Sequence, residues 1–142
     1  MDGMLAPVIA MVAWTLVVWW WMFALRIPAI ARLKIDPQKA ADEPGSQPML
    51  PLSVRRVSEN YNHLHEQPTL FYALALAMQM GGQTQELNLA LAWAYVASRI
   101  VHSLVQATVN VILVRFVVFA IGSLILMALT IHAALGLPHS FH

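Results

Sequence analysis

The chain has 142 residues, of which 59% are hydrophobic and 11% are charged, whereas a soluble domain has about 25% charged residues. Its formal net charge of +1 argues against a nucleic-acid partner, because such a partner requires a basic face. The chain has no cysteine, which excludes disulfides, thiolate metal sites and a cysteine nucleophile, and leaves any thiol chemistry to a substrate. These properties indicate one integral membrane domain over residues 1–142.

The first apolar run predicts a transmembrane helix over residues 4–25. No charge interrupts it between Leu5 and Leu25, and its length suffices because a spanning helix needs about 20 residues. The start of the chain, Met1-Asp2-Gly3, lacks the basic residues that open a secretory signal. We therefore expect this helix to be retained in the mature protein.

A loop over residues 26–52 follows, with charged residues and prolines that would end a long helix. A second helix is predicted over residues 53–80. Its apolar half, from Pro68 to Met80, is too short to span a bilayer, so the polar stretch before it must belong to the same helix. We expect Pro68 to kink this helix, because proline removes one backbone hydrogen bond.

Two further apolar segments complete an all-α, four-helix transmembrane bundle. After a turn at residues 81–85, helices are predicted over 86–110 and 111–136, joined by a very short connection. Lysine and arginine accumulate in cytoplasmic loops, and nearly all of them here lie in loop 26–52, at its edge or at Arg115. We therefore expect a cytoplasmic loop, a multi-pass topology and both termini outside the cytoplasm.

Polar residues in the second and third helices recur every three or four positions, which places them on one face of each helix. An ionisable group at the centre of a span costs about 2.5–3.5 kcal/mol, so such groups usually face a bundle interior or a wet cavity. Glu66 and Arg99 are predicted to form a buried ion pair. The candidate site residues that can converge are Arg56, Asn60, His63, Glu66, Gln67, Arg99, His102, Gln106, Asn110 and Arg115.

These residues also allow simpler interpretations. Polar side chains hydrogen-bond neighbouring helices within one chain or between subunits, so helix association alone would produce two polar stripes. Arg115 could serve only as an interfacial anchor. No metal site is expected, because His63 and His65 would point to different faces of a helix.

Two stretches resemble signatures of the MAPEG family, the membrane-associated proteins in eicosanoid and glutathione metabolism. Residues 60–72, Asn-Tyr-Asn-His-Leu-His-Glu-Gln-Pro-Thr-Leu-Phe-Tyr, are similar to its second-helix signature. Its third-to-fourth-helix signature is similar to Arg99-Ile100-Val101-His102 followed by Asn110 and Arg115-Phe116. The resemblance covers nearly the whole chain.

The resemblance implies four-helix bundles assembled as a homotrimer, with glutathione bound between neighbouring subunits in the cytoplasmic half of the membrane. Arg115 matches the arginine that stabilises the glutathione thiolate, and is the expected catalytic residue. A cation is needed there because the thiolate is the nucleophile and a thiol has a pKa of about 8.5. The residues expected to hold glutathione are Arg56, Asn60, His63, Glu66, Arg99, His102 and Asn110.

Three positions depart from the family's glutathione-using enzymes. His63 stands where these enzymes usually carry asparagine, Gln106 where some carry tyrosine, and Phe116 where a prostaglandin-making member has a small polar residue. The chain thus looks closer to the bacterial branch of the family, which implies a bacterial inner membrane.

The expected function is that of a membrane-bound, glutathione-dependent transferase or peroxidase. Its second substrate would be a hydrophobic small molecule, an apolar electrophile or lipid peroxide, that arrives from the lipid bilayer. An alternative is a non-enzymatic trimeric membrane protein that binds lipid or a partner in the same inter-helix groove. A third hypothesis is a small transporter with Glu66 as a proton-coupled acid.

Overall fold

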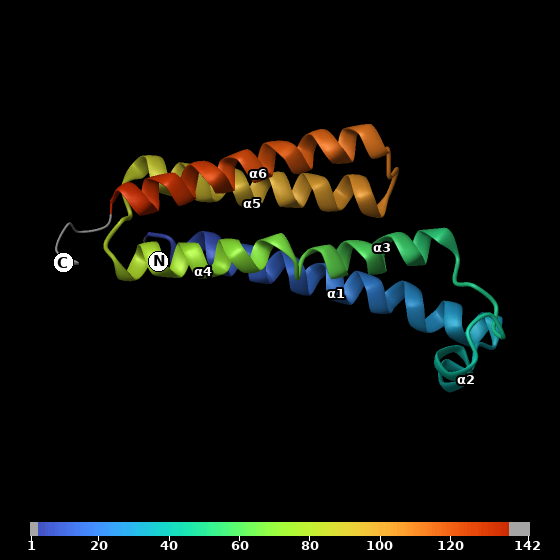
Figure 1. The fold of residues 1–142 in the computed structure, drawn as a ribbon. Coiled ribbons are helices and arrows are strands. Elements are labelled where there is room, and N and C mark those ends of the chain that lie inside the picture. Colours follow the sequence, from blue (N-terminus) through green and yellow to red (C-terminus); the bar gives the residue numbers. More distant parts are fainter. Residues whose placement is uncertain (1–2, 137–142) are drawn as a thin grey trace.

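The structure, a computed structural model, describes residues 3–136 and is all-helical over that range (Figure 1). Its elements are α1 (Leu5–Leu33), α2 (Pro37–Asp42), α3 (Leu52–His63), α4 (Gln67–Met80), α5 (Glu86–Ala107) and α6 (Ile112–Leu135). In Figure 1, α3 and α4 follow one another end to end beside α1, and α5 and α6 lie side by side above them. The α5–α6 turn and α2 lie at the same end of the molecule.

The first helix is longer than predicted, because α1 continues to Leu33 instead of ending at residue 25. Pro28 lies inside it, so its missing N–H does not end the helix here. The helix stops where Lys34 adopts a left-handed conformation with φ 54° and its N–H donates to the Ala31 carbonyl. The prediction ended the helix at the last residue of the apolar run. The helix continues beyond that residue, because no residue before Lys34 ends it.

The predicted loop contains a short helix of its own. Pro37 opens α2, and the Asp36 carboxylate accepts hydrogen bonds from the backbone N–H groups of Gln38 and Lys39. This is the usual arrangement at a helix start, with an aspartate cap and a proline whose missing N–H would have had no partner. The prolines of this loop therefore limit helix length without excluding a helix.

The predicted single helix over residues 53–80 is wrong, because the chain breaks at residues 64–66 into α3 and α4. In a continuous helix the carbonyl of Leu64 would accept from residue 68, but Pro68 has no N–H and its ring would clash with that carbonyl. Pro68 instead lies in the first turn of α4, where no such bond is required. Proline thus separates two helices here and does not merely kink one.

The connection between α5 and α6 is a tight turn over residues 108–111. Asn110 adopts a positive φ of 47°, which asparagine tolerates better than most residues. Its N–H donates to the Val105 carbonyl at 2.6 Å and closes the end of α5. The helices predicted over 86–110 and 111–136 are each present, with these turn residues removed from their ends.

Apolar side chains face both the interior and the outside of the molecule. The most apolar 18-residue windows of α1 and α6 are only 22% and 17% buried, whereas a core helix of a soluble protein would be mostly buried. By length and composition these two helices are able to cross a membrane. The buried core between the helices includes Met11, Val18, Val57, Leu64, Phe71, Met78, Tyr95 and Leu129.

Candidate functional site

A cavity of about 190 Å³ opens between α3, α5 and α6. Three predicted site residues line it, one from each helix: His63, His102 and Arg115. Ile112, Phe116 and Phe119 of α6 complete its wall. The two polar stripes and the start of α6 therefore converge, as the helical spacing predicted.

Arg115 is held in place by a residue of the neighbouring turn. Its Nη1 donates to the Asn110 side-chain oxygen at 2.8 Å. Asn110 can reach it because the left-handed backbone at this position folds the turn back onto the first turn of α6. Asn110, predicted as a ligand residue, thus contacts the arginine and is not part of the cavity lining.

Arg99 is the most deeply buried charged group of the described chain, at 1% exposure. No described residue hydrogen-bonds to any of its guanidinium nitrogens. Its guanidinium carbon lies 5.9 Å from the centroid of the Phe119 ring, at cation–π distance. A buried cation without a hydrogen-bonding partner is costly, so a group of this kind is a candidate for binding an anion.

Other polar atoms near Arg99 also find no partner among residues 3–136. Asn60 is completely buried, and neither its side-chain oxygen nor its nitrogen is hydrogen-bonded within that range. The same holds for Nδ1 of His102 and Oε1 of Gln106, both of which belong to side chains that are 2% exposed. Arg56 differs only in part, because its Nη1 donates to the Thr108 carbonyl at 2.7 Å while its Nε has no partner within that range.

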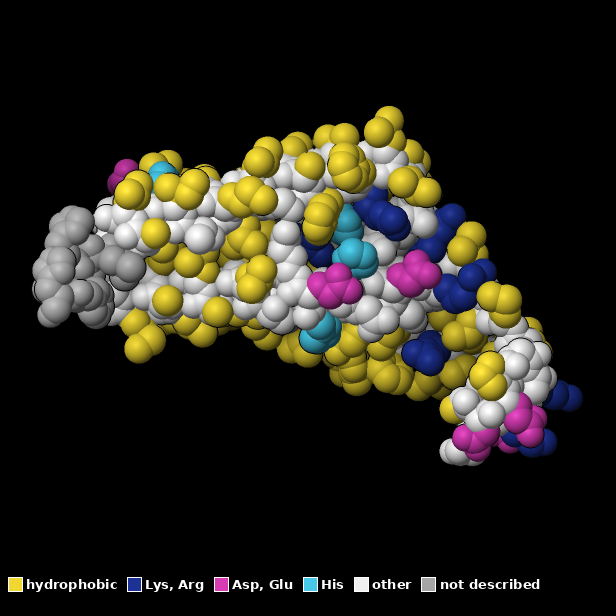
Figure 2. Space-filling model, viewed as in Figure 1, with side chains coloured by type: hydrophobic (Ala, Val, Ile, Leu, Met, Phe, Trp, Pro, Cys, Tyr) yellow, Lys and Arg dark blue, Asp and Glu magenta, His cyan; other side chains and the backbone are white. Residues whose placement is uncertain are grey.

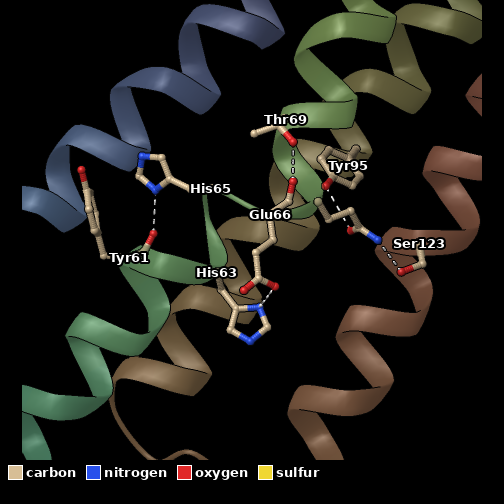
Figure 3. Close-up of polar contacts among 8 residues, drawn as sticks. Tyr61, His63, His65, Glu66, Thr69, Tyr95 and Ser123 are labelled. Atoms are coloured by element: carbon tan, nitrogen blue, oxygen red, sulfur yellow. Dashed lines mark hydrogen bonds and ion pairs between the residues drawn. The ribbon is translucent and has the colours of Figure 1, made fainter.

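The predicted buried ion pair between Glu66 and Arg99 is not formed. Glu66 lies in the break between α3 and α4, and its side chain is 67% exposed. Its carboxylate lies 3.7 Å from Nδ1 of His63, toward which it points in Figure 3. The prediction assumed a continuous helix, whereas Glu66 lies in the break that precedes Pro68 and is within ion-pair distance of His63.

Sequence reasoning did not assign the position of Phe119 or the partners of Gln67, although it placed Gln67 on the polar face of the second helix. Phe119 lines the cavity and also lies at cation–π distance from Arg99, and its position one turn after Arg115 was an available signal. Gln67 links three helices, since it accepts from the Tyr95 hydroxyl at 3.1 Å and donates to the Ser123 hydroxyl at 2.8 Å (Figure 3). No spacing rule could have paired these three residues, because they come from different helices.

A larger, mostly apolar groove of about 540 Å³ runs along α4 and α6. Its lining includes Leu70, Leu126, Met127 and Ile131, and it shares Phe119 with the smaller cavity. Figure 2 shows the same division over the visible face, where charged and histidine side chains gather mainly in the half that carries α3 and hydrophobic ones dominate elsewhere. Among the described residues no cluster of metal-ligating side chains is present.

Residues 4–135 match the model of the MAPEG family. The chain belongs to this family. No curated protein and no solved structure matches it. Family membership and the two outward-facing apolar helices together make this MAPEG protein a membrane protein, which explains why so much of the outer surface of α1 and α6 is apolar.

Proposed function

We propose that this MAPEG protein is a membrane-bound, glutathione-dependent transferase or peroxidase that acts on apolar electrophiles or lipid peroxides. The observation that carries the proposal is the cavity lined by His63, His102 and Arg115 beside the buried cation of Arg99. Few proteins keep two arginines and two histidines around one cavity of a membrane domain, because each such group is expensive there.

Arg115 would stabilise the glutathione thiolate. A thiolate is the reactive form of a thiol, and a neighbouring cation favours it. Asn110 leaves the Arg115 guanidinium charge unneutralised, since an amide oxygen accepts its hydrogen bond without contributing a charge. Arg115 therefore keeps its full charge for the sulfur.

Glutathione also carries two carboxylates, and Arg99 would bind one of them. Each guanidinium nitrogen of Arg99 is available as a donor, and arginine matches a carboxylate through two parallel hydrogen bonds. Asn60 of α3 and His102 and Gln106 of α5 offer further buried polar atoms without a partner among residues 3–136. Arg56 would contribute by holding the α5–α6 turn through the Thr108 carbonyl.

The apolar groove would supply the second substrate. A lipid peroxide or apolar electrophile would enter from the bilayer along α4 and α6, and its reactive end would reach the cavity at Phe119. Such a groove equally suits the alternative, a non-enzymatic protein that binds lipid there. The two functions differ in whether a thiol reacts.

We further propose a homotrimer of four-span subunits, in which α3 and α4 together form one span. The cavity of about 190 Å³ is smaller than the roughly 300–1,000 Å³ usual for ligand sites, and a neighbouring subunit would enlarge it. Basic residues around α2 and α3 favour this end as cytoplasmic, with both termini outside the cytoplasm of a bacterial inner membrane.

The test is calorimetry of glutathione binding to the detergent-purified protein. We expect saturable binding, and in Arg115→Ala a loss of about tenfold or more in affinity, since a charge-assisted contact contributes about 1.5–3 kcal/mol. Arg32→Ala removes an equivalent charge from the exposed end of α1 and should bind normally. No binding at millimolar glutathione would refute glutathione chemistry and favour the lipid-binding alternative.

A further inference from the structure

We propose that His63 is the general base that takes the proton from the bound thiol, and that the Glu66 carboxylate holds its ring in position. This inference rests on the proposed function and assigns its proton transfer to one residue. His63 would be a catalytic residue, and Glu66 a positioning residue that acts through it.

The geometry of His63 carries the inference. The residue ends α3, is partly exposed, and lines the same cavity as Arg115. Its Nδ1 faces the Glu66 carboxylate at 3.7 Å, and in Figure 3 the other ring nitrogen lies on the edge of the ring turned away from Glu66. One nitrogen is thus oriented by a carboxylate while the other is left for a substrate, as a positioned base requires.

The 3.7 Å between Nδ1 of His63 and the Glu66 carboxylate is longer than a hydrogen bond but within ion-pair distance. The ion pair forms once the imidazole carries a proton. When the imidazole gains a proton, it becomes the partner of a carboxylate that has no other cation within ion-pair distance among residues 3–136. Opposite charges at this distance attract each other, so this pairing favours the proton transfer. Catalytic contacts of this kind often tighten only when substrate binds.

Neither of the nearby histidines fits the role as well. His102 also lines the cavity, but it has Arg99 one turn before it on α5 and no carboxylate within ion-pair distance in the described chain, so a second positive charge there would be repelled. His65 points the other way, with Nδ1 2.9 Å from the Tyr61 carbonyl. Of the titratable or charged groups around His63, Glu66 is within ion-pair distance, the His102 ring lies 5.7 Å away between centroids, and Arg115 lines the same cavity. Arg55, Arg56, Glu59 and Tyr61 share its helix, and Arg99 lies on α5.

With an electrophile that has a leaving group, the proposed reaction consists of a proton transfer, a substitution and the return of the proton. The S–H bond of the thiol breaks, its electron pair stays on sulfur beside Arg115, and the proton forms an N–H bond with His63. The sulfur then forms a bond to carbon while the bond to the leaving group breaks, and the leaving group departs with that electron pair. His63 returns its proton to the leaving group or to water.

The experiment compares His63→Asn, Glu66→Gln and His65→Asn in detergent, with glutathione and chlorodinitrobenzene as substrates across a range of pH. General-base catalysis contributes about 10²–10⁴-fold, so His63→Asn should lose at least about 10²-fold in kcat at neutral pH while glutathione binding by calorimetry is retained. The loss should shrink as pH rises past about 8.5, where a thiol ionises without a base. Glu66→Gln should show a smaller loss with the same convergence, and His65→Asn none.

The outcomes separate this inference from the proposed function. If wild-type protein binds and turns over glutathione but His63→Asn has an unchanged kcat, or a loss that is the same at every pH, His63 is not the base and only the inference falls. If the wild-type protein does not bind glutathione, the proposed function falls with it. Retained binding together with a pH-dependent loss supports both.

Discussion

The buried guanidinium of Arg99 gives the sharpest prediction about this protein. It is 1% exposed, and none of its nitrogens has a hydrogen-bond partner among residues 3–136. Desolvating such a charge costs several kcal/mol, and even a buried ion pair is often replaced by apolar residues of similar volume with a stabilisation of about 1–4 kcal/mol. We therefore expect Arg99→Met to stabilise the ligand-free protein, although it removes a fully packed side chain.

At about 3 °C per kcal/mol for a chain of this size, the Tm of Arg99→Met should rise by roughly 3–12 °C without ligand. Glutathione at about a hundred times its Kd should stabilise the wild type by about 2.7 kcal/mol, and should leave Arg99→Met unchanged because the carboxylate has lost its arginine. The ligand-free variant would thus be more stable than the ligand-free wild type but no longer respond to glutathione.

Thermal unfolding in detergent, followed by circular dichroism with and without glutathione, measures both effects. Arg32→Met makes the same substitution at the exposed end of α1 and should change stability by less than about 0.5 kcal/mol. A marked loss of stability in ligand-free Arg99→Met, with the glutathione response intact, would refute the reasoning. Arg99 would then be a structural cation paired within the assembled protein.

Two further predictions concern α6. Phe119→Ala removes the side chain shared by the cavity and the apolar groove, so we expect relative activity toward bulky electrophiles to rise and the free energy of unfolding to fall by about 2 kcal/mol. Val117→Ala on the exposed face is the control. An unchanged substrate preference would show that Phe119 does not separate the cavity from the groove. A Cβ at Gly122 would lie 2.7 Å from the Ser98 hydroxyl, so Gly122→Val should destabilise the α5–α6 contact by about 1–3 kcal/mol, measured by thermal unfolding. The control Ile121→Val should not change stability in this way. A stable Gly122→Val would mean that α5 and α6 can separate freely at this point.

The convergence of the site could be predicted from sequence because it depends on local geometry. Steps of three and four residues fix which side chains share a helix face, and a short α5–α6 turn fixes which ends meet. This was enough to bring His63, His102 and Arg115 to one cavity. The same reasoning placed Arg99 in the interior, where it is buried.

The partners of individual groups could not be predicted in this way. Glu66 was assigned to Arg99 on the assumption of one helix, yet the break before Pro68 turned it to His63. Asn110 was expected to bind ligand, yet its positive φ brings its oxygen to Arg115. Both contacts have one origin, because a few backbone angles in a short non-helical segment redirect a side chain by more than its spacing can indicate.

The sequence by itself determined the all-helical fold, the apolar exterior and the identity of the polar residues that must face inward. These follow from composition and periodicity, since each transfer of a charge to lipid is costly whatever the neighbours are. Only the tertiary structure decided that Arg99 lacks a protein partner, that Glu66 meets His63, and that Phe119 stands between a polar cavity and an apolar groove. The pair of Glu66 and His63 is local and depends on where the chain breaks, whereas the other relations join different helices and depend on how the helices pack.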